Sequence, residues 1–208
     1  MVLRNLAFSL GLAAISCALG LGYLSTTRIE YFPPSFLSAN SACGGQDKIV
    51  DEIEADWYPK HWRAAEEPSL YLASRASKAR SLRFTWLRTF ENPVIVRIDE
   101  LPSGKMRLTA KQLSGAGGYE PGEVARKIVR DLTAEEQAKL VATLAQTRVF
   151  ELPSRVCDGG LDGTQWIVEA TGPSGYQYVN RWSPERGPVY DLGLALLGLT
   201  GWQFERAY

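Results

Sequence analysis

Carboxylates gather in one short stretch of the chain, between residues 158 and 169. Asp158, Asp162, Gly163 and Glu169 stand at positions one, five, six and twelve of this stretch, which is the spacing of a calcium-binding EF-hand loop. The third position departs from that pattern, because Gly160 stands where an EF-hand carries Asp or Asn. An EF-hand also needs a helix on each side, whereas the residues after Gly163 have strand character. The stretch therefore predicts a turn before a strand, with weak calcium binding as the alternative and no assigned metal site.

The same acidic residues, together with Arg181 and Trp182, are the candidate binding residues of the chain. General acid–base catalysis needs two titratable groups held in different environments, and the spacing of Asp158, Asp162 and Glu169 does not show that they converge. The chain has one histidine and contains no GxSxG, HExxH or CxxC pattern. We therefore expect a non-catalytic binding or envelope-assembly protein of unknown ligand, without a cofactor. A small carboxylate-dependent hydrolase is the alternative, and no catalytic residue is assigned.

The amino terminus carries an export signal. Arg4 precedes an uncharged apolar run from Leu6 to Leu24, and a short basic region before an apolar run is typical of secreted proteins. The run is also about long enough to cross a bilayer. Residues 1–24 are therefore expected to be a signal peptide or a membrane anchor, and lipid attachment at Cys17 is a weaker alternative. The sequence predicts a periplasmic or envelope protein that contacts the membrane only through residues 6–24.

Charge and cysteine content narrow the possible partners. Lys plus Arg and Asp plus Glu each number 23, so the basic surface that nucleic-acid binding requires is not indicated. We expect no nucleic-acid partner, and the partner is taken to be an unidentified envelope protein or ligand. Export would place Cys43 and Cys157 in an oxidising compartment, which predicts a disulfide between them. Two unpaired thiols are the alternative, because sequence gives no distance between the two residues.

The elements that would position the acidic stretch are mostly strands. Alternating apolar and polar residues predict three antiparallel strands at 81–90, 93–98 and 105–113. The glycine-rich segment 115–122 lacks the phosphate-loop patterns and is expected to be a wide loop or bulge. Together with a later hairpin, these runs predict an antiparallel sheet of about five strands.

The hairpin is expected to follow the acidic stretch directly. Two β-rich runs flank a turn that we centre on Pro173 and Ser174. We expect Trp166 and Val168 to share a face of the sheet with the aromatic residues of the second run, which are Tyr176, Tyr178 and Trp182.

Helices complete the predicted fold. One is expected to begin after Asp47 and to end near Trp57, because Pro59 interrupts the pattern. Further helices are expected from residue 67, after the capping box at 132–136, and over the apolar segment 187–199. The sequence thus predicts an α+β domain at 67–208, with the sheet and its C-terminal β-hairpin packed by two to three helices, preceded by a linker and N-terminal helix at 25–66.

Several short sequence patches, taken together, carry a resemblance to other proteins. From about Trp57 onward the chain resembles a group of uncharacterised bacterial exported proteins of unknown function. The resemblance implies a setting in the bacterial periplasm or cell envelope, and it implies no activity. The patches that carry it are Glu67-Pro-Ser-Leu-Tyr71, Arg88-Thr-Phe90 with Pro93-Val-Ile-Val-Arg97, Gly115-Ala-Gly-Gly-Tyr-Glu-Pro-Gly122, Asp162-Gly-Thr-Gln-Trp166 and Arg181-Trp-Ser-Pro184.

Overall fold

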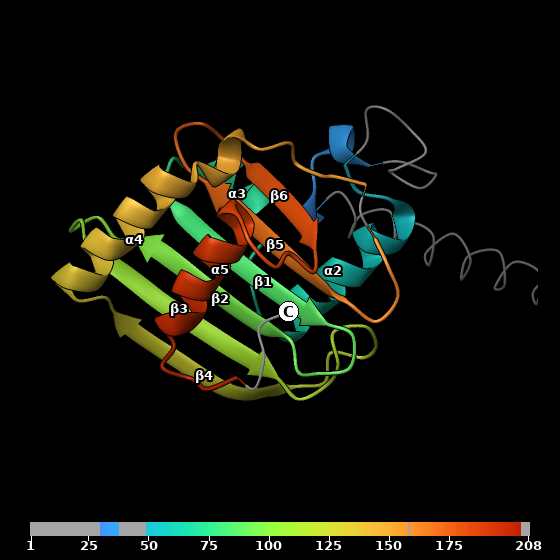
Figure 1. Ribbon diagram of the computed structural model, residues 1–208. Coiled ribbons are helices and arrows are strands. Elements are labelled where there is room, and N and C mark those ends of the chain that lie inside the picture. Colours follow the sequence, from blue (N-terminus) through green and yellow to red (C-terminus); the bar gives the residue numbers. More distant parts are fainter. Residues whose placement is uncertain (1–29, 38–48, 158, 205–208) are drawn as a thin grey trace, which may run out of the picture.

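The protein is described here by a computed structural model, which describes residues 30–37, 49–157 and 159–204. A single antiparallel sheet of six strands forms its centre, in the order β4-β3-β2-β1-β5-β6 (Figure 1). The predicted α+β class and the C-terminal hairpin are confirmed. The strands are β1 (Ser81–Arg88), β2 (Val94–Glu100), β3 (Met106–Leu113), β4 (Val124–Asp131), β5 (Thr164–Thr171) and β6 (Gln177–Trp182).

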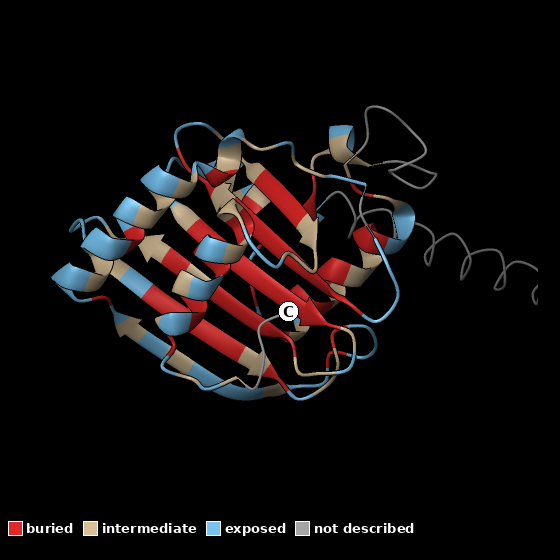
Figure 2. Ribbon diagram, viewed as in Figure 1, coloured by how far each residue is buried: buried red, intermediate tan, exposed pale blue. Residues whose placement is uncertain are grey.

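Helices cover both faces of the sheet, so the domain has three layers (Figure 1). One face is covered by α4 (Ala134–Thr147) and α5 (Pro188–Gly198), and the other by α2 (Glu52–Ala64) and α3 (Leu70–Ala76). Two short 3₁₀ turns, η1 (Pro34–Phe36) and η2 (Val149–Glu151), lie in the connections. Because both faces are covered, the inner strands are buried along most of their length (Figure 2).

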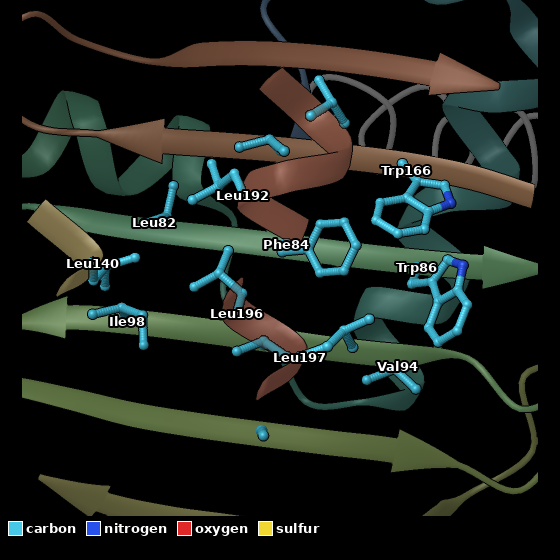
Figure 3. Close-up of a cluster of buried hydrophobic side chains, with 14 of the residues drawn as sticks. Leu82, Phe84, Trp86, Val94, Ile98, Leu140, Trp166, Leu192, Leu196 and Leu197 are labelled. Carbon is cyan, nitrogen blue, oxygen red and sulfur yellow. The ribbon is translucent and has the colours of Figure 1, made fainter. Parts of the chain in front are cut away.

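The core beneath α4 and α5 is almost wholly apolar. Phe84, Trp86 and Trp166 meet on it, with ring centroids 5.2 Å apart for Phe84 and Trp166 and 5.6 Å apart for Trp86 and Trp166. Leu192 and Leu196 of α5 lie over these rings (Figure 3). Helix α5 can approach this closely because Gly193 faces the rings, where a Cβ would lie 2.4 Å from the Trp166 ring.

Local signals set the helix boundaries. Asp51 begins α2 and Thr133 begins α4, each as a capping box in which the side chain and the Glu three residues later exchange hydrogen bonds with the backbone. The expected end of the first helix near Trp57 is wrong, because α2 continues through Pro59 to Ala64. Proline removes one backbone hydrogen bond. The buried packing of the second half of α2, around Trp62, outweighs that loss.

The hairpin turn lies where it was expected, but the predicted sharing of faces is wrong. Ala170 pairs with Gln177, so the turn is centred on Pro173 and Ser174. A two-residue turn places an even-numbered residue opposite an odd-numbered one, and directly opposed residues share a face. Trp166 therefore lies opposite Arg181, and the aromatic residues of β6, such as Tyr178, face α2 and α3.

The buried unit begins before the predicted domain boundary at residue 67. Tyr31 and Phe32 are buried in the core between the sheet and α2, where Tyr31 stacks on Trp62. The Ser69 hydroxyl donates a hydrogen bond to the Glu30 carbonyl. Segment 30–37 is therefore part of the packed domain. None of the helices in the described ranges has the length and apolar character needed to cross a bilayer, and the apolar run at 6–24 lies outside those ranges.

Candidate functional site

The predicted acidic cluster does not come together among the described residues. Asp162 is exposed and adopts a left-handed φ of 57° in the bend before β5. Glu169 lies five residues beyond Thr164, the first residue of β5, which amounts to roughly 16 Å along an extended strand, and it is fully buried. Asp158 lies outside the described residues. Across the described ranges, no group of three or more His, Cys, Asp or Glu side chains is arranged to hold a metal ion.

Glu169 instead forms an ion pair with Arg83 on the neighbouring strand β1. The Arg83 Nε and Nη2 groups donate to the two Glu169 carboxylate oxygens at 2.7 and 2.8 Å, and both side chains are fully buried. Burial by itself lowers the pKa of the Arg83 guanidinium, but the Glu169 carboxylate, with smaller contributions from Glu67 and Tyr176, more than offsets this effect and leaves that pKa above its ordinary value. The pair is geometrically well matched, as bidentate Arg–carboxylate pairs are.

Surrounding groups complete the hydrogen bonding of this buried pair. The Tyr176 hydroxyl donates to Glu169 at 2.9 Å, and Arg83 Nη1 donates to the Pro68 carbonyl at 2.7 Å. The Arg83 guanidinium also lies 4.4 Å from the centre of the Trp62 ring. Desolvation, with the Glu169 charge adding to it, raises the pKa of Tyr176 well above its ordinary value. Tyr176 therefore stays protonated at neutral pH and cannot act as a general base.

A second set of buried charges lies beside the first. Glu67, in the connection between α2 and α3, accepts from Arg97 Nε at 2.7 Å and lies 2.8 Å from Lys111 Nζ. Lys111 also donates to the Ala65 carbonyl at the end of α2, at 2.5 Å. A cation at a helix C-terminus interacts favourably with the helix dipole. These charges bind the α2–α3 connection to the sheet, and they keep the Glu67 carboxylate buried and paired.

Arg181 and Trp182 also have structural positions. Arg181 lies on the opposite face of the sheet from Glu169, and its Nη2 group donates to the Pro153 carbonyl at 2.9 Å. Trp182 packs against the loop before β5, where a Cβ on Gly163 would lie 2.3 Å from its ring. The structure thus brings Trp182 to the predicted loop, but it separates Arg181 from Glu169.

Cys157 is disulfide-bonded. Cys43, its predicted partner, lies outside the described residues, so the pairing of Cys43 with Cys157 stays a prediction.

A groove of about 360 Å³ lies at one end of the strands, between α4 and the turn of the β5–β6 hairpin. Its apolar wall lies where Leu82, Ile98 and Leu140 meet at one end of the core (Figure 3). Its volume lies within the range of roughly 300–1,000 Å³ that is usual for small-molecule sites. The apolar residues that line it include Leu82, Ile98, Met106, Leu140, Leu144 and Phe150.

Polar groups line the groove near the hairpin turn. Arg80 is the only cationic residue among its lining residues and Glu100 the only anionic one. Their side chains approach to 3.4 Å, and the Arg80 side chain is 64% exposed. The Thr171 hydroxyl is buried and has no hydrogen-bond partner within the described part of the chain. By strand alternation, however, the Thr171 side chain lies on the same face of β5 as Glu169, toward α2 and α3, and not in the groove.

A patch of exposed aromatic and aliphatic side chains lies elsewhere, around the glycine-rich loop. Phe90 and Tyr119 are each 59% exposed and their ring centroids lie 6.1 Å apart. Ile53 and Trp57 line an open hollow beside Tyr119. Trp57 donates from Nε1 to the Gly117 carbonyl at 2.7 Å, which fixes α2 to the loop. Among the described residues that form this patch, no buried polar side-chain atom lacks a hydrogen-bond partner.

The sequence analysis did not identify the groove. Its walls come from three distant parts of the chain, around residues 80–106, 140–150 and 170–177. Arg80 is visible in the sequence only as the last of several cations between 75 and 80, which suggest a solvated surface. Comparison of the chain with protein-family models and with curated proteins finds no match.

Proposed function

We propose that the protein is a non-catalytic binding protein and that the groove between α4 and the hairpin turn is its binding site. The carrying observation is the groove itself: an apolar hollow of about 360 Å³ with polar groups near one end, the usual composition of a ligand site. The arrangement of the acidic residues supports the same conclusion. Both carboxylate oxygens of Glu169 are bonded to Arg83, and Asp162 lies in the exposed bend before β5, far from Glu169.

The binding proposal can be tested with a neutral fluorescent apolar probe, such as N-phenyl-1-naphthylamine, added to the purified full chain. We expect saturable binding that is lost when Leu144→Trp fills the groove. Leu194→Trp is the matched control, because Leu194 is a partly exposed residue of α5 that does not line the groove. Val141→Trp is a second groove variant at a half-exposed position, in case Leu144→Trp does not fold. Equal binding by the groove variants and the control would contradict the proposal.

We also propose that the protein works outside the cytosol, in the bacterial periplasm or envelope, with a disulfide between Cys43 and Cys157. The support is the apolar run at 6–24 with its preceding basic residue, and the disulfide-bonded state of Cys157. Fractionation of the native cells should place the protein in the envelope or periplasmic fraction. Peptide mapping of that material without reduction should yield a linked peptide pair containing Cys43 and Cys157. Recovery in the cytosolic fraction with free thiols would contradict this proposal.

A further inference from the structure

We infer that the groove takes a single-chain amphiphile with a carboxylate head, whose chain lies against the apolar wall and whose head reaches Arg80. This inference rests on the proposed binding function and names the class of its ligand. Two features of the groove carry it: the extent of the apolar wall and the unused donors of Arg80.

The apolar part of the groove has room for an alkyl chain. It extends from Leu82 and Ile98, where the sheet is fully packed, to Leu144 and Phe150, which are only partly buried. At roughly 30 Å³ for each water-sized group, a hollow of about 360 Å³ has room for a chain of about ten carbon atoms. Burying such a chain removes apolar surface from water on both partners, which favours binding.

The head of the ligand is selected by Arg80. Arg80 Nη1 contacts Glu100 at 3.4 Å, and this is the only ion pair or hydrogen bond of the guanidinium within the described residues. An exposed pair of this kind contributes little, so the remaining N–H donors are available. The guanidinium fork fits the two oxygens of a carboxylate.

The surroundings of Arg80 fix its position and favour an anion. Its stem lies over Gly172 in the hairpin turn, where a Cβ would come within 3.2 Å of the Arg80 Cγ atom. Lys78 and Arg80 line an adjoining hollow at the same end of the strands, where Glu100 is the only acidic lining residue. The mouth formed by the two hollows therefore carries a net charge of +1 from Lys78, Arg80 and Glu100.

The test uses photolabelling of the full chain in neutral phosphatidylcholine nanodiscs. The probe is decanoic acid with a terminal diazirine, and the corresponding alcohol and amine serve as neutral and cationic probes. Mass spectrometry locates the labelled peptides. We expect the acid to label the peptides around residues 140–150 saturably, at about tenfold lower concentration than the alcohol, as a charge-assisted hydrogen bond predicts. Acetate, which has the head but not the chain, should not compete.

Variants separate the two levels of the inference. Arg80→Gln should remove the preference for the acid over the alcohol, whereas Arg75→Gln, at an exposed cation that does not line the groove, should retain it. Equal labelling by acid and alcohol, preferred labelling by the amine, or an unchanged preference in Arg80→Gln would overturn the carboxylate inference and leave groove binding intact. Absence of saturable labelling by all three probes would overturn the proposed binding function as well. Thermal unfolding of each variant confirms that it is folded.

Discussion

The two faces of the sheet are buried in different ways. Beneath α4 and α5, the strands present apolar residues such as Phe84, Val96 and Val168. Beneath α2 and α3, the alternate positions of the same strands include Arg83, Lys111 and buried polar groups between aromatic rings. Alternation along each strand sends the two sets to opposite faces. One chain segment therefore carries both an apolar core and a charged one.

The difference between the faces shows what each kind of contact can specify. The paired charges on the α2–α3 face join particular atoms, so Arg83 and Lys111 fix the connection between α2 and α3 through the Pro68 and Ala65 carbonyls. Apolar contacts have no such direction. On the α4–α5 face, the helices cover the centre of the sheet but leave the groove open beside the hairpin turn. The closed face supports the fold, and the partly open face holds the groove that we propose as the binding site.

The largest expected effect comes from breaking the charged face. Glu169→Ala leaves the Arg83 guanidinium buried without its carboxylate, and removal of one partner of a buried ion pair costs roughly 3–5 kcal/mol. Chemical denaturation of the variant and the parent protein measures the loss. Glu135→Ala is the control, because Glu135 belongs to an exposed pair with Lys139, and it should change the unfolding free energy by less than about 1 kcal/mol.

A double variant sharpens the comparison of the faces. Arg83→Met combined with Glu169→Leu makes this part of the charged face apolar like the other one, and similar replacements of buried pairs are often neutral or stabilising. We expect the double variant to regain most of the stability lost in Glu169→Ala. If the double variant were less stable than Glu169→Ala, the α2–α3 face could not be packed with apolar residues as the α4–α5 face is.

The apolar face should respond to volume instead of charge. Gly193→Ala places a methyl group where the Trp166 and Phe84 rings already lie, at 2.4 and 2.9 Å, and such overpacking typically costs about 1–3 kcal/mol. Gly198→Ala is the matched control in the same helix, because a Cβ there meets no atom within 4 Å. The control should leave the protein as stable or slightly more stable. Equal unfolding free energies for the two variants would contradict the close packing of α5.

The smallest expected effect is a pH dependence of the unfolding free energy, which arises from His61 in α2. His61 is buried, and desolvation lowers its pKa below 6.5, although the Trp57 and Ala116 carbonyls partly oppose this. The unfolded chain then binds the proton more readily, so stability is complete above pH 6.5 and falls as the pH drops below it. His61→Gln should flatten this slope between about pH 7 and 5.5. Because the chain has one histidine, an unchanged slope in the variant would contradict the assignment.

The sequence by itself determined the features that depend on neighbouring residues. The capping box at Thr133, the turn at Pro173 and Ser174, and the alternation of β1 and β2 all act over a few positions, and each lies where it was predicted. These signals were enough to give the α+β class. The strand β4 was missed because it is an edge strand whose exposed charged residues hide the alternation, as is usual for sheet edges.

Only the tertiary structure decided which distant residues meet. Arg83 and Glu169 are 86 positions apart, and they pair because β5 lies beside β1 in the sheet. The groove likewise depends on where α4 ends relative to the hairpin turn. Local propensity and capping act within a turn or two of the chain, whereas strand order and helix placement follow from packing of the whole domain. The candidate binding site belongs to this second group, which is why no local pattern pointed to it.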